Sequence, residues 1–246
     1  PAVPSDDLKD LSQYAIDLTN LEHVSPTHEW VTGAGQWENA VQSYLASVTF
    51  ADHCLGLVLD ALEKSEHSDN TIIALFSDHG FHLGEKERWA KRSLWEDGTR
   101  VPVVVASPGH KLGQKTNRPA ELLDVFPTLL ELAGLPADST QEGQSLVPLM
   151  KNPQREWNHP AITSFGLGNY SVRSTRYRFI QYFDGSRELY DLSKDPHEWK
   201  NLIDNPKLEK VIQEHASFIP QKQHPILPGS STGHKAYAAA KKKLNK

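Results

Sequence analysis

The sequence predicts an α/β fold: part of a mixed or parallel sheet flanked by helices, followed by a smaller subdomain on an antiparallel sheet. Two observations lead to this prediction. Strand and helix patterns alternate up to about residue 150, whereas apolar and polar residues alternate one by one in segments after residue 160. We expect residues 1–150 to form the first part, 151–220 the small α+β subdomain, and 221–246 an extended basic tail.

Two short apolar runs and one long periodic segment define the first part. Residues 71–76 and 101–106 are continuously apolar or β-branched, which is typical of neighbouring central strands buried on both faces of a parallel sheet. Over residues 36–64, apolar residues recur at steps of three and four, which predicts an amphipathic helix packed on that sheet. Residues 1–35 show no such period, and we interpret them as surface loop.

The later elements have clearer boundaries. A second helix is expected over residues 121–133, with Pro127 near its start and Gly134 just past its end. Further on, apolar residues alternate on both sides of the dipeptide Asp184-Gly185, which predicts a β-hairpin. A helix near residues 208–218 should follow it.

Composition excludes several classes of protein. The 246 residues carry a formal charge of −5 and a pI near 6.2, which argues against a nucleic-acid-binding surface. Cys54 is the only cysteine, so the sequence predicts neither a disulfide framework nor a cysteine zinc site. No apolar run approaches the roughly 18 residues of a membrane span, and we therefore expect none.

The chemistry lies in one stretch that follows the first apolar strand. Asp78 and His79 come directly after that strand, at the end where open α/β sheets bind ligands, and Gly80 allows a tight turn. An acid beside an imidazole favours a metal site, although a capping aspartate and a structural histidine are the alternative. Lys91 and the basic residues near it, Lys86, Arg88 and Arg92, offer positive charge for an anionic substrate.

The full motif, SDHGFHLGEKERWAKRSLWEDGTRVP over residues 77–102, resembles the signature of the type I sulfatases of the alkaline phosphatase superfamily. Four further stretches agree with that family in order and spacing: SYLASVTFADHCLGLVLDALE, ELLDVFPTLLELAGLP, EGQSLVPLM and NYSVRSTRYRFIQYFDGSRELYDLSKDPHEWKNL. The resemblance covers residues 36–203 and is nearest to iduronate-2-sulfatase and its bacterial relatives. It implies the C-terminal half of an alkaline-phosphatase-like domain.

This resemblance implies roles for five residues. Asp78 and His79 would complete a divalent-metal site, which holds Ca²⁺ in most of the family, although a histidine suits Mn²⁺ or Zn²⁺ as well. Lys91 would bind the sulfate oxygens. Phe81 and His82 would line the pocket, with His82 either a proton donor to the leaving group or a purely structural residue.

The resemblance also implies what this sequence does not contain. The family nucleophile is a formylglycine made from the first residue of a Cys/Ser-x-Pro-x-Arg motif, and neither Cys54 nor any serine here fits that motif. We expect the formylglycine and the other metal acids on a missing N-terminal half, as in a fragment, a processed subunit or a truncated chain. The isolated chain should then be inactive.

Family resemblance further implies a sulfated carbohydrate substrate such as a glycosaminoglycan, and a periplasmic, secreted or lysosomal location. Two alternatives remain open. One is a phosphonate or phosphodiester hydrolase of the same superfamily, which shares the Asp-His-Gly turn. The other is a non-catalytic remnant that binds or supports without turnover.

Overall fold

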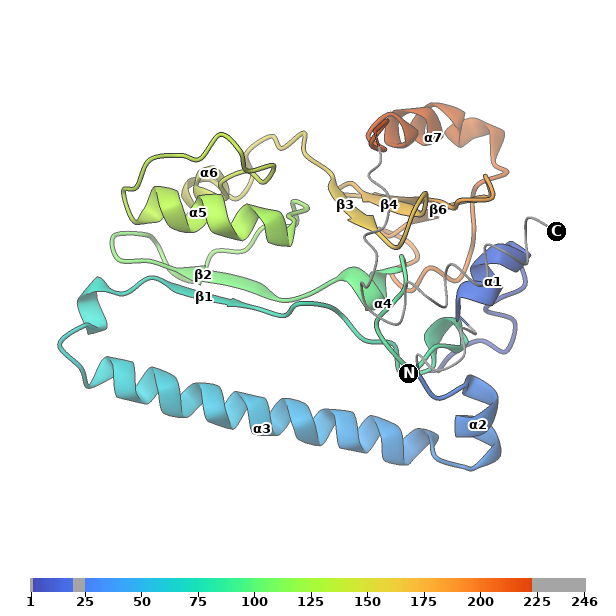
Figure 1. Cartoon of the computed structure of the whole chain (residues 1–246), viewed down its shortest axis with the longest axis horizontal. Coiled ribbons are helices and arrows are strands. Elements are labelled where there is room, and N and C mark those ends of the chain that lie inside the picture. The colour runs from blue at the N-terminus through green and yellow to red at the C-terminus, as the bar shows by residue number, and fades with distance from the viewer. Residues whose placement is uncertain (1, 20–24, 223–246) are drawn as a thin grey trace. The chain divides into compact units, whose positions relative to one another are not determined.

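The computed structural model describes residues 2–19 and 25–222 and shows a mixed α/β protein (Figure 1). The chain divides into two compact units that do not follow the order of the sequence. The first unit comprises the described parts of Pro1–Gly33, His79–Arg100 and His159–Lys246. The second unit comprises Ala34–Asp78 and Val101–Asn158. The motif of residues 77–102 therefore belongs mainly to the first unit, although it leaves from and returns to strands of the second.

The second unit contains a two-stranded sheet made by the two predicted apolar strands. Strand β1 (Ile73–Phe76) pairs with β2 (Val103–Ala106), so the prediction that they are neighbours is confirmed. The pairing is antiparallel, which corrects the parallel prediction, and Phe76 lies opposite Val103. The segment between the strands thus returns beside the point where it left. An apolar run predicts that a strand is buried but does not predict its direction. Here the direction of β2 follows from the path of the loop, which returns to the end of β1 that it left.

Burial of these strands is also less complete than predicted. Leu75, Phe76 and Val104 are 39%, 46% and 53% exposed. Strands that are buried on both faces need neighbours on each side, and the described residues supply only one strand neighbour for each. These two strands are therefore more apolar than their partial burial in this chain would lead one to expect.

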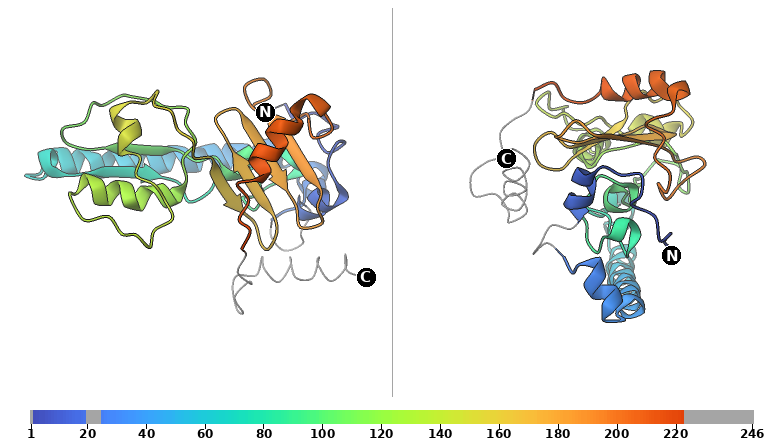
Figure 2. Two further views of the ribbon diagram at one scale, coloured as in Figure 1. Left: turned by 90° about the horizontal axis from the view of Figure 1, so that it is seen from above. Right: turned by 90° about the vertical axis from the view of Figure 1, so that its right-hand side faces the viewer.

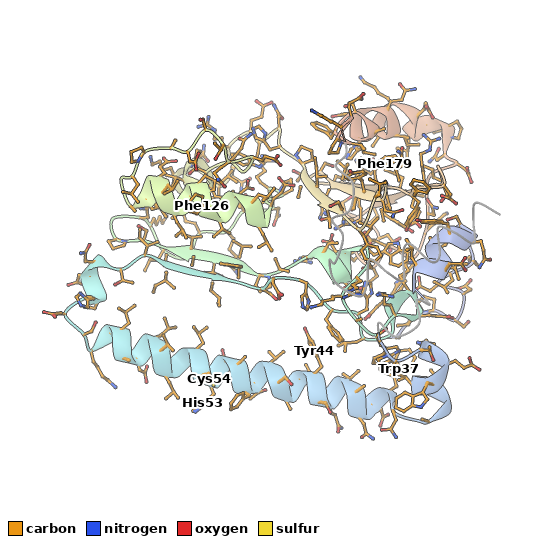
Figure 3. The ribbon with its side chains drawn as sticks, in the orientation of Figure 1. Trp37, Tyr44, His53, Cys54, Phe126 and Phe179 are labelled. Atoms are coloured by element: carbon orange, nitrogen blue, oxygen red, sulfur yellow. The ribbon has the colours of Figure 1, made fainter. Side chains whose placement is uncertain are left out.

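The predicted long helix is present as α3 (Trp37–Glu63), but the predicted packing on the sheet is wrong for the described chain, because none of its residues is buried. Figure 3 shows its side chains, among them the exposed Cys54. Periodicity predicts that one face of a helix will be covered but does not identify the cover. The exposed large apolar side chains of α3 are Tyr44, Leu45, Val48, Phe50, Leu57, Val58 and Leu59.

Helix α3 also corrects the statement that no apolar run approaches the length of a membrane span. Its 27 residues include a window of 18 with a mean hydropathy of 1.4. By length and composition it could cross a membrane. Core helices of soluble proteins meet the same criterion.

The second predicted helix is confirmed as a 3-10 turn (Leu122–Asp124) that continues into α5 (Val125–Leu132). Glu121 and Asp124 form a capping box at its start, and Gly134 follows its end with a φ of 68°. Asp124 also accepts a hydrogen bond from the backbone N–H of Gln144 at 2.7 Å. The helix start thereby fixes the loop that leads to α6 (Val147–Lys151).

The first unit contains the predicted small antiparallel sheet, in the order β3-β4-β5-β6. The strands are β3 (Ala161–Ser164), β4 (Tyr170–Arg173), β5 (Tyr177–Gln181) and β6 (Arg187–Asp191). The turn between β5 and β6 contains the predicted Asp184-Gly185, and Gly185 has a φ of 87°, which glycine adopts without strain. The predicted final helix is α7 (Glu209–Ala216). Of the predicted tail, residues 223–246 lie outside the described chain.

The two faces of this sheet have separate cores, because successive residues of β5 point to opposite sides. Phe179 packs with Leu189 and with Ile212 of α7 on one face. Ile180 packs on the other face with residues of α1 (Gln13–Thr19), including Tyr14. Figure 2 shows α7 across one face of the sheet and α1 beneath the other.

The prediction of a surface loop over residues 1–35 is wrong. The segment forms α1 and α2 (His28–Gly33), and Ala15 and Val31 are buried. Both helices span only two turns or fewer, which is too short for an apolar period to be visible. Ser12 accepts a hydrogen bond from the N–H of Ala15 at 3.1 Å and marks the start of α1.

Candidate functional site: the loop between β1 and β2

The predicted site residues lie on the segment that connects β1 to β2, and a closed loop brings two of them together. The N–H of His82 donates to the carbonyl of Ala90 at 3.0 Å, and the N–H of Gly84 donates to the carbonyl of Arg88 at 3.0 Å. These bonds close the chain between residues 82 and 90 like a hairpin. Lys91 consequently lies next to the residues that precede His82, although it is 12 positions from His79.

The Nζ of Lys91 lies 2.8 Å from Nε2 of His79. On the other side of the same ring, Nδ1 lies 2.7 Å from the carbonyl of Gly80. A carbonyl can only accept, so Nδ1 carries the proton and Nε2 presents its lone pair to the ammonium group of Lys91. A backbone carbonyl that fixes the tautomer in this way is the usual support of a metal-binding histidine.

Gly80 is required in this turn because of space. A Cβ atom at Gly80 would lie 2.1 Å from the carbonyl oxygen of Asp97, and the N–H of Gly80 donates to the carbonyl of Gly98 at 3.1 Å. The backbone after His79 therefore lies directly against the short helix α4 (Glu96–Thr99). This contact holds the beginning and the end of the loop together.

The remaining predicted residues differ in exposure. Asp78 is exposed and directly precedes His79, and Phe81 is 37% exposed, so both can meet a ligand. His82 is fully buried, and burial together with the charge of Arg88 lowers its pKa to about 3. A histidine with that pKa is neutral at physiological pH and has no acidic proton to give. Its environment therefore favours the structural role over the proton donor.

Two of the cations predicted to meet a substrate anion lie inside the protein instead. Lys86 is 1% exposed and forms an ion pair with Asp7, and Arg88 is 1% exposed and donates to the carbonyl of Leu18 at 3.2 Å. The interpretation of Lys86 and Arg88 as substrate cations is thus corrected. Lys91 is exposed and is therefore still a candidate for binding a substrate anion.

Around the loop lies a buried network of charges that the sequence did not predict. Glu96 pairs with Arg178 and, at 3.2 Å, with Arg173 of the small sheet, and these arginines lower its pKa although burial acts in the opposite direction. Trp95 donates to the Glu188 carboxylate at 2.8 Å. No local pattern indicates such partners, since they lie about 80 to 90 positions apart. They anchor the end of the site loop on the small sheet.

Comparison with known protein families identifies the family of this chain. The sulfatase family profile matches residues 10–135, and the profile for the C-terminal region of N-sulphoglucosamine sulphohydrolase matches residues 84–224. The chain belongs to the sulfatase family. A sulfatase of Formosa agariphila is 42% identical over 221 residues, which cover 90% of this chain and 43% of that protein.

Solved structures show the same fold. A protein solved with its substrate D-glucosamine-2-N,6-O-disulfate is 30% identical, with a TM-score of 0.64 over 71% of this chain and 38% of the other. A phosphonate monoester hydrolase of Agrobacterium radiobacter is 26% identical, with a TM-score of 0.60 over 68% of this chain and 37% of the other. This chain spans less than half the length of curated relatives that it matches.

Proposed function

We propose that this chain is the part of a sulfuric ester hydrolase that provides metal-binding and sulfate-binding residues for a sulfated carbohydrate. The observation that supports this most is the 2.8 Å contact between Lys91 and His79 at the start of the loop that follows β1. It joins a cation to an oriented imidazole, and Asp78 is the neighbouring residue. The similarity to a protein solved with a disulfated glucosamine supports the substrate class.

The donor set fits a divalent cation. Asp78 offers a carboxylate, and His79 offers Nε2 in the tautomer that its contact with Gly80 fixes. In the family such an ion stabilises the negative charge of the reacting ester. Ca²⁺ is the proposed ion, with Mn²⁺ or Zn²⁺ as alternatives because of the histidine. The other metal acids and the formylglycine nucleophile would come from a segment outside this sequence.

In this proposal Lys91 has two successive partners. Without the ion it donates to Nε2 of His79. If His79 held a metal through that nitrogen, the ammonium group of Lys91 would lose this partner and would be available to bind a sulfate oxygen. A positioned cation of this kind stabilises the charge that develops on the transferred group. Phe81, which is partly exposed on the same loop, would contact the sugar.

The test uses the full-length protein and measures release of inorganic sulfate from sulfated disaccharides, with a phosphonate monoester as the comparison substrate. Sulfate release that Asp78→Asn and Lys91→Ala each reduce at least a hundredfold supports the proposal. Faster hydrolysis of the phosphonate would favour the second candidate, which the similarity to a phosphonate monoester hydrolase supports. No hydrolysis of either, in protein that carries its nucleophile, would favour a non-catalytic remnant.

The isolated chain is expected to show no turnover in the same assay, because no Cys/Ser-x-Pro-x-Arg motif occurs in it. Turnover by the chain alone would contradict this part of the proposal and would require another nucleophile. By family we also propose a periplasmic, secreted or lysosomal location for the whole protein.

A further inference from the structure

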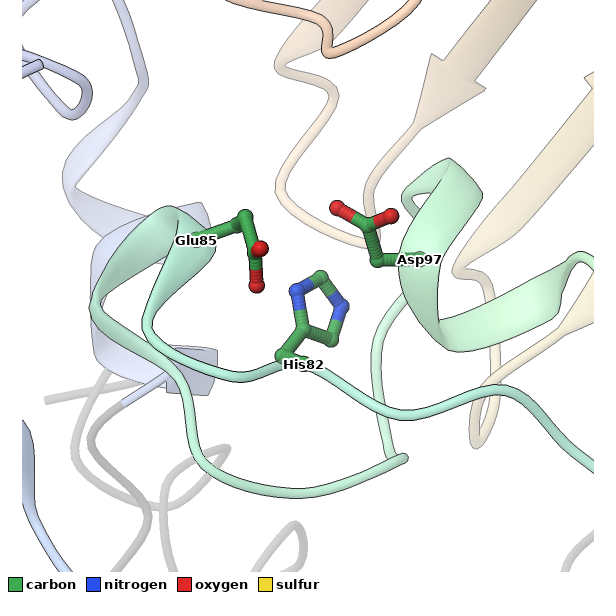
Figure 4. A group of neighbouring side chains, drawn as sticks. All are labelled: His82, Glu85 and Asp97. Atoms are coloured by element: carbon green, nitrogen blue, oxygen red, sulfur yellow. The ribbon is translucent and has the colours of Figure 1, made fainter. Parts of the chain in front are cut away.

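Three side chains with metal-binding atoms meet inside the loop between His79 and Arg100. Ligand atoms of His82, Glu85 and Asp97 all lie within 4.8 Å of one another. Figure 4 shows the imidazole of His82 between the two carboxylates. His82 and Glu85 are buried, whereas Asp97 is partly exposed. The cluster is therefore enclosed except at Asp97, the residue that is partly exposed.

The imidazole of His82 has an unsatisfied nitrogen in this cluster. Nε2 lies 2.7 Å from the hydroxyl of Ser93, whereas Nδ1 is buried and makes no hydrogen bond of good geometry, although the backbone of Glu85 lies near the ring. Figure 4 shows the edge of the ring with this second nitrogen toward Glu85. A buried polar atom without a partner costs free energy and needs a physical explanation. If Nε2 donates its proton to Ser93, the lone pair of Nδ1 points into the cluster.

The two carboxylates oppose each other without a cation between them. Burial raises the pKa of Asp97 to about 6, and the nearby carboxylate of Glu85 acts in the same direction. Glu85 accepts one hydrogen bond, from the N–H of Leu83 at 2.7 Å. The charge of Lys86 also reaches the cluster, but Lys86 is paired with Asp7. A bound cation would satisfy the imidazole nitrogen and remove the repulsion between the two acids.

We propose that His82, Glu85 and Asp97 form a binding site for a divalent transition-metal ion such as Zn²⁺, in addition to the Asp78–His79 pair. One imidazole and two carboxylates are a donor set that Zn²⁺ accepts. Two ligand atoms about 2.0–2.2 Å from a tetrahedrally coordinated ion are about 3.3–3.6 Å apart. Separations of up to 4.8 Å therefore require two ligand atoms to approach each other by up to about 1.5 Å, which is less than about 1 Å for each atom. Water would complete the coordination.

This site has a structural consequence for the proposed sulfate-binding lysine. His82 and Glu85 belong to the closed loop of residues 82–90, and Asp97 belongs to α4. An ion bound by all three would connect the two ends of the segment that carries Lys91. Ser93, which lies between them, would fix the histidine tautomer from the outer shell. The ion would therefore order the loop and need not contact the substrate.

The experiment is metal binding to the chain with Asp78→Asn, which disables the other candidate pair. Equilibrium dialysis with Zn²⁺ and metal analysis should give one ion per chain. Asp97→Asn in that background should weaken binding at least tenfold, and Ser93→Ala by about 10- to 100-fold, as for other outer-shell partners. Asp52→Asn, an exposed acid on α3, is the matched control and should leave binding unchanged.

Binding of Co²⁺ gives a second, spectroscopic readout. If the three side chains were only structural, no absorption bands of bound Co²⁺ would appear. Visible absorption bands of bound Co²⁺ should appear in the Asp78→Asn chain and disappear with Asp97→Asn. Absence of a bound ion in the Asp78→Asn chain overturns the proposal, even if the Asp97 variant does not fold. Equal binding by the Asp97→Asn and Asp52→Asn chains also overturns it, because the ion would then be held elsewhere.

Discussion

Lys91 donates to the nitrogen of His79 that a metal ion would need, at 2.8 Å. The opposite nitrogen of His79 is held by the carbonyl of Gly80. A metal at Nε2 and the ammonium group of Lys91 thus exclude each other. This competition would connect the two proposed functions of the site, because a metal bound at His79 would free the cation that is proposed to bind sulfate.

The competition gives a pair of expected outcomes in the full-length protein. Asp78→Asn removes a ligand charge and should weaken metal binding. Lys91→Ala removes the competitor and should leave metal affinity unchanged or higher, while kcat/KM for a sulfate ester falls about a hundredfold or more. Calorimetry with Ca²⁺ and Mn²⁺ and a rate assay separate the two effects. Weaker metal binding by the Lys91 variant would contradict this arrangement.

Gly80→Ala tests whether the turn after His79 is as tight as the structure shows. The added methyl would lie 2.1 Å from the backbone oxygen of Asp97, so the loop must move. We expect a loss of about 1–3 kcal/mol in the free energy of unfolding, measured in urea, as for other overpacked positions.

The matched control is Gly56→Ala in α3, where no atom lies within 4 Å of the added Cβ. Alanine is the better helix former, by roughly 0.5–1 kcal/mol, so this variant should not lose stability. If the two substitutions changed the free energy of unfolding equally, the lack of space around Gly80 would not be the reason for a glycine in this turn.

The elements that could be predicted from the sequence are those with a local cause. The hairpin around Asp184-Gly185 and the helix that ends at Gly134 are present because a turn dipeptide and a helix-ending glycine act within a few residues. The association of Lys91 with the Asp-His-Gly turn could be inferred from the family motif. None of these required knowledge of distant contacts.

The elements that could not be predicted depend on distant contacts. The direction of β1 against β2 follows from where the intervening loop returns, and the burial of Lys86 follows from Asp7, which is 79 positions away. A cluster of basic residues looks the same in sequence whether it faces solvent or a buried acid. The Asp97 contribution to the cluster around His82 was missed for the same reason. The sequence does place a histidine, a glutamate and an aspartate in this one loop, at positions 82, 85 and 97, but their spacing gives no sign that they meet.

The ion pair between Asp7 and Lys86 should be one of the main supports of the first unit. The Lys86 ammonium group also donates to the carbonyl of Glu198 and lies 5.4 Å from the ring of Trp199. Asp7→Asn leaves a buried cation without its counter-ion, which typically costs about 3–5 kcal/mol. Urea unfolding measures the loss.

The control for that variant is Asp6→Asn, which removes the exposed partner of Lys9 and should change stability little. If Asp7→Asn were as stable as Asp6→Asn, the N-terminal segment would not be docked through this pair.

The apolar face of α3 should make the isolated chain self-associate or bind hydrophobic dyes. Leu45 and Val48, three residues apart on one face of the helix, are 56% and 51% exposed, and soluble monomers rarely expose large apolar patches. Replacing both by glutamate should reduce dye fluorescence and shift size-exclusion elution toward the monomer. Glutamate at Gln42, an exposed polar position on the same helix, should change neither. A wild-type chain that is monomeric and does not bind dye would contradict the expected exposure.

The attachment of α7 should weaken in mild acid because of His215. Its Nδ1 lies 2.8 Å from the carbonyl of Val211, and its Nε2 lies 2.9 Å from the hydroxyl of Ser174. Burial lowers the pKa of His215 below 6.5, the value expected in the unfolded chain. Between these two pKa values the unfolded state binds a proton that the folded state does not.

Stability from this group is therefore fully present above about pH 6.5 and declines as the pH falls toward the folded pKa. The slope from one proton is at most about 1.4 kcal/mol per pH unit. Urea unfolding between pH 5 and 8 should show this decline, and His215→Gln should flatten it, because glutamine does not titrate. Lys210→Gln, an exposed substitution on the same helix, should keep the wild-type slope. A His215→Gln protein with the wild-type slope would place the acid sensitivity in another histidine, for which the buried His82 is the next candidate.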